Sequence, residues 1–581
     1  MQKRLHLRTL LAGPARCLPI LGLALNLTAC STSLDTKRGR SAGSPTPGSS
    51  ATTGTEPMVP GATSGSPAVD PNAPPTTTTV TPPTGPARGV LRLLTNEEYR
   101  NTVKDVLKLG TVPTDTLQTE SRSESYKNFS DALSVSNTLG GQYANLAKRV
   151  AAEITDFQAL APCAQGASPR DCANTFVRSF GKNAFRRPLT EAEVQGYLTM
   201  FDGELTRTSY NEGIRLMVED VLQSPNLLYR FELGTPAGST RVLDSYETAT
   251  LLSYMLSTTA PDPELLAAAD VKALGPAERE SQARRLLTLQ PARDAVRSFV
   301  RQWTQIDAIT SINKDAAIYP TFTPELWTSM IVETNRFIDS VIWEGDGSFK
   351  TLMTSSSSFA DGPLAAHYGT NTNSPAGTLV PVALDPSQRM GLLTQGSVLG
   401  SHSKAGESFP IARGKLVRER FLCQKLQPPP AALKIVPVAA DPNRTARERF
   451  EAHSSNPGCA GCHSLIDPVG FGLESYDGVG QFRTMDNGKP INAAGMLTAT
   501  TDIDGPFTGV ELSQKLSTSK EAQDCFSLQA MEWAFGRFTL KNDTDRALAT
   551  AITTQMPAGL DVKEALIGII KSDAFTTRSA Q

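Results

Sequence analysis

Residues 457–463 read PGCAGCH, and this stretch decides the fold of the most distinctive part of the chain. Two cysteines separated by two residues and followed at once by a histidine form the pattern of c-type haem attachment. The spacing follows from chemistry, because two thiols add to the two vinyl groups of one porphyrin while the next imidazole reaches the iron. A helix-like turn supplies that geometry. The stretch therefore predicts a cytochrome-c-like helical domain with one covalent haem c, attached through Cys459 and Cys462 and ligated by His463.

Three other interpretations compete with haem attachment. A zinc knuckle needs a second ligand pair at matching spacing, and the chain has no second C-x-x-C. A thioredoxin-like dithiol needs a strand before it and a helix after it, whereas residues 454–458 (SSNPG) indicate a turn. A plain disulfide is the third alternative. The export signal described below favours haem over all three.

Outward from this motif, the composition predicts a mainly α protein made of several small helical domains in series. A chain of 581 residues is too long for one core, and ordinary domain sizes give roughly three to five domains. Aromatic residues are sparse at 6%, which favours helices packed on helices over a strand-rich sandwich. The 56 basic and 58 acidic residues nearly balance and form no long run of one sign, so we expect no nucleic-acid partner.

Helix starts are visible as capping boxes, in which an N-terminal Thr or Asp is followed three residues later by Glu. Such boxes begin at Thr95, Thr190 and Asp244. Apolar periodicity predicts further helices at residues 278–289, 294–304 and 324–343, the last with Pro324 in its first turn.

The N-terminus has the pattern of an export signal. Residues 1–16 carry four basic and no acidic side chains, and residues 17–29 form an apolar run that is too short to span a bilayer. The run ends in LTAC at residues 27–30, which resembles the lipobox of bacterial lipoproteins. Cys30 is then the lipidated first residue of the mature protein, with an ordinary secretory cleavage site as the alternative.

A linker of Ser, Thr, Pro, Gly and Ala follows the lipobox. Such a composition buries too little apolar surface to offset chain entropy, so we expect a disordered tether. The predicted location is the bacterial cell envelope, with a lipid anchor in the membrane. Ser31 rather than Asp follows the lipidated cysteine, which by analogy with better-known lipoproteins favours the outer membrane, facing the periplasm or the exterior.

The number of cysteines is consistent with a lipidated, haem-bearing, exported protein. Of eight cysteines, Cys17 lies in the signal, Cys30 takes lipid and two hold the haem. Four remain in a disulfide-permissive compartment, where three connectivities are possible. We expect Cys163 to pair locally with Cys172, which leaves Cys423 and Cys525 as the long-range pair.

The sixth iron ligand is open at this level. Methionine and histidine are the usual axial partners of electron-transfer haems, and the candidates are Met485, Met496, His402 and His453. Met496 lies in a loop-like stretch similar to the methionine loop of small cytochromes c, with an ordinary packed methionine as the alternative. We favour Met496 over His453, because it follows the motif at a distance that lets the chain fold over the opposite porphyrin face.

Several motifs outside the haem stretch resemble a large bacterial family of c-type-haem proteins assembled from serial domains of unknown function. These domains are numbered fifteen-eighty-seven, fifteen-ninety-five, fifteen-ninety-two, fifteen-eighty-eight and fifteen-eighty-five. The resemblance implies haem and export rather than a particular reaction. The motifs are RLLTNEEY at 92–99, FRRPL at 185–189, LAAHYG at 364–369, RGK at 413–415 with Cys423 and its proline run, DPVGFGLE at 467–474, Asp524-Cys525 and FGR at 535–537.

Motifs and composition breaks together predict the domain organisation. The segments are a lipoprotein signal peptide at 1–29, a disordered linker at 30–87, helical domains at 88–160, 161–238 and 239–375, a haem c domain at 386–484 and a C-terminal helical domain at 500–578.

Three functions fit these features. The first is an envelope-tethered electron-transfer or redox-accessory protein with a redox partner protein. The second is a haem enzyme, peroxidase-like or oxygenase-like, with an open iron position. The third is a binding or scaffolding lipoprotein. A single C-x-x-C-H favours the first, and enzymatic activity stays open. No catalytic signature stands out, and we expect the isolated His367 and His402 to be structural.

Overall fold

The computed structural model describes residues 89–114, 116–120, 126–130, 133–307, 313–427, 437–454, 457–537, 542–556 and 559–579. These residues belong to one compact unit, residues 79–581. The signal peptide, Cys30, the linker to residue 87 and the proline run after Gln427 lie outside the described residues. No helix in the described ranges combines the length and the apolar character that a membrane crossing requires.

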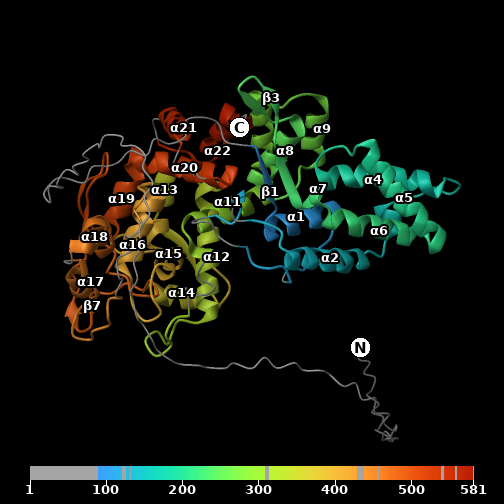
Figure 1. Cartoon of the computed structure of the whole chain (residues 1–581). Helices are drawn as coiled ribbons and strands as arrows, with labels where there is room; N and C mark the ends of the chain where they lie inside the picture. The colour runs from blue at the N-terminus through green and yellow to red at the C-terminus, as the bar shows by residue number, and fades with distance from the viewer. Residues whose placement is uncertain are drawn as a thin grey trace, which may run out of the picture. The chain divides into compact units, whose positions relative to one another are not determined.

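The predicted mainly α class is confirmed, since helices dominate the described residues and the strands are short (Figure 1). The first half contains β1 (Val90–Leu93), α1 (Asn96–Leu107), α2 (Asn137–Ala152), α3 (Phe157–Leu160), α4 (Pro169–Phe185), α5 (Glu191–Arg207), α6 (Tyr210–Gln223), α7 (Pro225–Leu228), β2 (Tyr229–Glu232), β3 (Thr235–Ala237), β4 (Thr240–Val242), α8 (Ser245–Ser257), α9 (Pro263–Val271), α10 (Pro276–Leu286) and α11 (Gln290–Trp303).

The second half of the chain is also mainly helical with short strands, and α16, α17 and α18 lie together (Figure 1). Its elements are α12 (Pro324–Ile342), α13 (Phe349–Thr354), β5 (Ser357–Ala360), α14 (Gly362–His367), β6 (Val380–Ala383), η3 (Leu392–Thr394), α15 (Gly396–Ser401), α16 (Pro410–Leu416), the π-helix η4 (Val417–Phe421), α17 (Ala446–Ser454), α18 (Pro457–Phe471), β7 (Met485–Asp486), β8 (Lys489–Pro490), β9 (Ala494–Leu497), β10 (Gly505–Thr508), α19 (Glu511–Thr518), α20 (Lys520–Phe535), α21 (Asp543–Thr554), α22 (Val562–Lys571), α23 (Asp573–Thr576) and β11 (Thr577–Ser579).

Local sequence signals explain where several helices begin. The three predicted capping boxes form, with Thr95, Thr190 and Asp244 each accepting the backbone N–H three residues on while the Glu side chain accepts from the cap. Pro324 opens α12 as predicted. The helices expected at 278–289 and 294–304 are α10 and α11, and each begins a few residues earlier than predicted.

Two large hydrophobic clusters carry most of the packing. The first lies within α1–α7, from Leu93 to Leu228, and adds Tyr254 of α8. The predicted domains at 88–160 and 161–238 therefore share one core. The second cluster extends from Tyr126 to Phe575 and includes side chains of α8, α11, α20 and α22.

Segments far apart in the sequence meet around one buried carboxylate. β1 pairs antiparallel with β2, and β11 pairs antiparallel with β4. Glu232 of β2 accepts from Arg92 Nη2 at 3.2 Å and from Arg578 Nη2 at 2.8 Å. All three side chains are buried, so the Glu232 carboxylate is compensated by two guanidinium groups within the interior, as a buried ion requires.

Candidate haem-attachment site

The two motif cysteines lie on α18, whose burial changes along its length. From Cys459 to Leu465 every residue is exposed or half-buried, and continuous burial begins only near Ile466. Cys459 and Cys462 are unpaired thiols of intermediate exposure. Gly461 between them faces open space, since a Cβ placed on it would meet nothing within 4 Å. The first two turns of α18 thus present two partly exposed thiols that belong to no disulfide.

His463 is held by a carboxylate one helical turn further along. Its Nδ1 lies 3.0 Å from Asp467 Oδ1 and 3.1 Å from Oδ2. The Asp467 side chain is only 3% exposed, while that of His463 is 18% exposed. The hydrogen bond to Asp467 raises the pKa of His463 above its usual value. A proton held on Nδ1 leaves the lone pair of the neutral ring on Nε2, which is the nitrogen a metal ligand uses.

Close helix packing fixes the position of α18 against α16. A Cβ on Gly470 would lie 1.9 Å from the carbonyl oxygen of Pro410, and one on Gly414 would lie 2.1 Å from that of Ile466. Both helices therefore approach through bare backbone, which only glycine allows. Gly414 belongs to the RGK motif at 413–415, so the sequence motif acts in packing rather than in binding.

Buried arginines anchor the segments around α18 through backbone carbonyls. Arg413 donates to the carbonyl oxygens of Leu473 at 2.9 Å, Tyr476 at 2.7 Å and Asp477 at 2.5 Å. Arg418 donates to the carbonyl oxygen of Leu465 in α18 at 3.0 Å. A guanidinium group offers five donors in a fixed fork, which suits it to several acceptors at once.

Met496 lies on strand β9, whereas the sequence predicted a loop. β9 pairs antiparallel with β10, and Gly495 fits against Gly472 at the end of α18. Alternation along the strand turns Met496 outward, 40% exposed, between buried neighbours. Its role as a packed core methionine is therefore excluded, while iron ligation stays a prediction. Met485 on β7 is also exposed, at 48%.

The histidine candidates differ in their availability. His402 is buried, with Nδ1 2.8 Å from the Val398 carbonyl oxygen and Nε2 3.4 Å from Gln305 Oε1. Burial lowers its pKa to about 4. His367 is also buried, its Nε2 lies 3.1 Å from the Val479 carbonyl oxygen, and burial lowers its pKa to about 4. Both are structural in this fold. His453 belongs to α17, and its side chain lies outside the described residues.

The predicted disulfides are confirmed in both pairings. Cys163 bonds to Cys172 and Cys423 bonds to Cys525. Cys172 lies in the first turn of α4 rather than in a loop. The second bond joins the segment that precedes the haem motif to α20.

The donor set on α18 fits a covalent haem better than the alternatives. A zinc site needs further ligands, and no group of three or more His, Cys, Asp or Glu suited to a metal occurs among the described residues. A thioredoxin-like dithiol follows a strand, whereas α17 is the element before α18. Two thiols outside disulfides and an imidazole with its Nδ1 engaged form a donor set that fits covalent haem attachment.

The sequence analysis did not predict two polar clusters, one around Asp467 and one around Glu333. Asp467 was recognised only as part of the DPVGFGLE motif, without a role. Glu333 is buried and accepts from Ser358 and Tyr368, each at 2.6 Å, and burial raises its pKa to about 7. Arg389 lies over the Tyr368 ring and donates to the Gly480 carbonyl oxygen at 2.6 Å. No local sequence pattern marks such a cluster.

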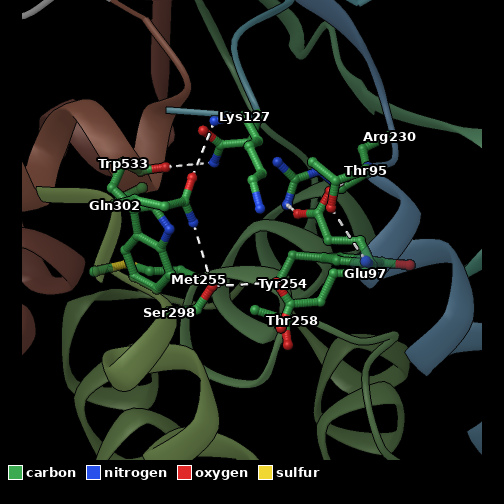
Figure 2. Close-up of a pocket in the computed structure, with 13 residues that line it drawn as sticks. Thr95, Glu97, Lys127, Arg230, Tyr254, Met255, Thr258, Ser298, Gln302 and Trp533 are labelled. Carbon is green, nitrogen blue, oxygen red and sulfur yellow. Dashed lines mark hydrogen bonds and ion pairs between the residues drawn. The ribbon is translucent and has the colours of Figure 1, made fainter. Parts of the chain in front are cut away.

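A separate pocket lies between α1, α8, α11 and α20, away from α18. Figure 2 shows Lys127 and Arg230 reaching into it beside Tyr254 and Ser298. Its free volume of about 20 Å³ has room for about one water molecule. Lys127 is paired with Asp307 at 3.2 Å and Arg230 with Glu98 at 3.4 Å, so this pocket does not compete with α18 as the functional site.

The fold and the site define a class of protein. It is helical and built from serial modules, and one module carries a pair of free thiols and a histidine bonded to a carboxylate. Four family models match the chain in order, each described as a protein of unknown function: DUF1587 at 92–156, DUF1595 at 172–232, DUF1592 at 243–370 and DUF1588 at 389–486. The DUF1588 model bears the short name PSCyt3, a cytochrome-like name, and covers the haem motif.

The chain therefore belongs to the multidomain family built from these serial domains of unknown function. The fifth domain predicted at 500–578 and the predicted domain boundaries stay predictions. No curated protein and no solved structure matches the chain.

Proposed function

We propose that this protein is a c-type haem protein of the bacterial cell envelope that exchanges single electrons with a redox partner protein. The observation that carries the proposal is the first part of α18, where two partly exposed thiols outside any disulfide are followed at once by His463. One covalent haem, attached to Cys459 and Cys462, would supply one-electron chemistry. The protein's own residues hold and orient it.

The individual roles follow from position. Cys459 and Cys462 would fix the porphyrin edge along α18, and His463 would offer Nε2 to the iron. Met496 is the proposed sixth ligand because it follows the motif at a distance that lets the chain fold back over the porphyrin, although its side chain lies on the exposed face of β9, opposite to Gly495 and Leu497. Thioether ligation raises the potential relative to two histidines, so the choice of ligand would be measurable.

Membrane attachment is the second part of the proposal. We infer lipidation at Cys30, because LTAC follows a basic and then apolar leader and a diacylglyceryl group on that thiol would supply the two acyl chains that stable anchoring takes. The test is Cys30→Ala with fatty-acid labelling, and loss of label with release from the membrane fraction is expected. Equal labelling of parent and variant would overturn this part.

The decisive experiment for haem uses the single variants Cys459→Ala and Cys462→Ala in the full chain. Each thiol would form one thioether bond, so neither variant should keep the complete two-bond attachment. Haem staining on a denaturing gel and the alkaline pyridine spectrum, which distinguishes one thioether from two, are the measurements. Gly461→Ala is the matched control, because it changes the same turn without touching a thiol. Two intact thioethers in both cysteine variants would overturn the proposal.

A haem enzyme with an open iron position is the second candidate, and the carboxylate bonded to His463 favours it. Hydrogen bonding to a carboxylate increases the donor strength of a ligating imidazole, as suits iron that works in oxidised states. Carbon monoxide separates the candidates. If ferrous protein binds it readily and the oxidised spectrum shows no methionine band, the iron is open. A band lost in Met496→Ala and kept in His453→Ala supports electron transfer.

A further inference from the structure

We propose that Asp467 is a positioning residue that places a buried negative charge behind the proximal histidine and so lowers the reduction potential of the haem. The inference rests on the proposed function, since it assumes haem attachment on α18. It goes beyond that function in naming a residue that sets which oxidation state the iron prefers.

The geometry behind this role is a two-oxygen contact on one helix face. Both carboxylate oxygens of Asp467 lie within 3.1 Å of His463 Nδ1, and the two residues are one helical turn apart, where side chains meet. A backbone carbonyl in the same place would bring a dipole, whereas the carboxylate brings a full charge. That difference makes the hydrogen bond charge-assisted and stronger.

Asp467 also lacks the basic partner that usually neutralises a buried acid. Among the described residues it forms no ion pair with Arg or Lys, and its other contact is with the Ser454 hydroxyl of α17. Glu474 offers the contrast within the same module. It is equally buried, yet Arg483 lies 3.2 Å from it and Arg413 3.9 Å. The charge of Glu474 is compensated locally, while that of Asp467 acts on His463.

The consequence for the iron follows from ligand basicity. An imidazole whose N–H donates to a carboxylate is a stronger electron donor through its other nitrogen. Stronger donation stabilises ferric over ferrous iron, and second-sphere hydrogen bonding is one of the means by which proteins tune haem potentials. Asp467 would thus favour the oxidised state of a haem bound through His463 at potentials where a carbonyl-supported histidine would allow reduction.

Replacing Ser454 should shift the reduction potential in the opposite direction to replacing Asp467. The Ser454 hydroxyl donates to Asp467 Oδ2 and shares its one proton with the Phe450 carbonyl oxygen at 2.9 Å, and the share donated to Oδ2 draws charge away from the bond to His463. Ser454→Ala removes this competition and should strengthen the effect of Asp467 on the imidazole. If Asp467 only joined α17 to α18, Asp467→Asn and Ser454→Ala should shift the reduction potential in the same direction or leave it unchanged.

The experiment is a redox titration of the full-length protein, followed in the visible spectrum, on variants shown by gel staining to carry covalent haem. At a fixed applied potential, Asp467→Asn should increase the ratio of ferrous to ferric iron at least tenfold, which for one electron corresponds to about 59 mV. Ser454→Ala should decrease the ratio. Glu474→Gln, which removes a like charge from the same module, should change it by less than twofold.

The outcomes separate the two proposals. Covalent haem that persists without the motif cysteines contradicts the proposed function. Covalent haem with a ratio within twofold of the parent in Asp467→Asn overturns the role of Asp467 alone. If Asp467→Asn fails to fold or to take up haem, Ser454→Ala decides the matter, because an unchanged or increased ferrous fraction in that variant is also incompatible with the proposed role.

Discussion

Helices α4 and α18 begin alike and are used differently. Both start at a proline and carry a cysteine in the first turn. In α4, buried residues recur from Cys172 to Phe185 as one continuous stripe, and Cys172 is closed in a disulfide. In α18, continuous burial starts near Ile466, and the cysteines before it are free.

This difference shows how a helix can be divided between packing and chemistry. The stripe of α4 follows the spacing of three and four residues that buries one helical face along its whole length. The second half of α18 does the same through Val469 and Gly470, with Gly470 in backbone contact with α16. From Cys459 to Leu465, the described side chains of α18 belong to neither of the two large clusters. The apolar packing that holds the described part of α18 thus lies beyond Leu465.

The largest expected effect concerns the two disulfides, one beside each helix. Replacing Cys423 and Cys525 by Ala should lower the free energy of unfolding by about 4–5 kcal/mol, because the closed loop is long, with a sequence separation of 102. Replacing Cys163 and Cys172 should cost about 3 kcal/mol, since their separation is 9. Urea denaturation of both double variants is the measurement. Equal losses would contradict the loop-entropy explanation.

A smaller effect is expected from the two arginines that donate to backbone carbonyl oxygens near these helices. They are Arg413 of α16, which binds the segment after α18, and Arg186, the C-cap residue of α4. Arg413→Ala leaves two buried carbonyl oxygens and one half-buried carbonyl oxygen beyond α18 without their donor, at a cost of about 3 kcal/mol. Arg186 caps α4 and donates to carbonyl oxygens including that of Asn226 at 2.7 Å, so Arg186→Ala should cost a similar amount.

The two arginine variants should nevertheless differ in hydrogen exchange. Amides of α18 should lose protection in Arg413→Ala, because its first half has no apolar stripe to hold it. Amides of α4 should stay protected in Arg186→Ala, since the stripe remains. The same protection pattern in both variants would show that the two helices are held in the same way.

The smallest effect comes from one glycine in each helix. Gly461→Ala in α18 adds a methyl group in open space and should stabilise by up to about 1 kcal/mol through helix propensity. Gly181→Ala in α4 places a Cβ 2.5 Å from Leu189 Cδ1 and should destabilise by about 1 kcal/mol through overpacking. Thermal unfolding of both variants measures the opposite signs, and a loss of stability in Gly461→Ala would mean that the turn is packed after all.

Local signals in the sequence predicted much of this fold. The capping boxes at Thr95, Thr190 and Asp244 depend on residues three apart and were found for that reason. The disulfides followed from counting cysteines after the motif and the lipobox had been assigned. The helical class followed from composition, and the family from short motifs.

The remainder depended on contacts that no local pattern encodes. The sequence indicated only a helix-like turn at the motif, because that turn is all that the geometry of two thiols and an imidazole on one porphyrin needs. In the structure α18 runs on to Phe471, and this places Asp467 one turn after His463. The strand at Met496 was missed because AGML at 494–497 is short and contains glycine, and β9 exists only through its pairing with β10.

The carboxylate of Glu232 links distant parts of the chain, and this has a consequence for the order of assembly. Arg92 and Arg578 both bind it, although 486 positions separate the two arginines. One of the two guanidinium partners of Glu232 is therefore absent until the strand that carries Arg578 has been made. The cluster around Glu232 is complete only after α18, with its motif thiols, has already been synthesised.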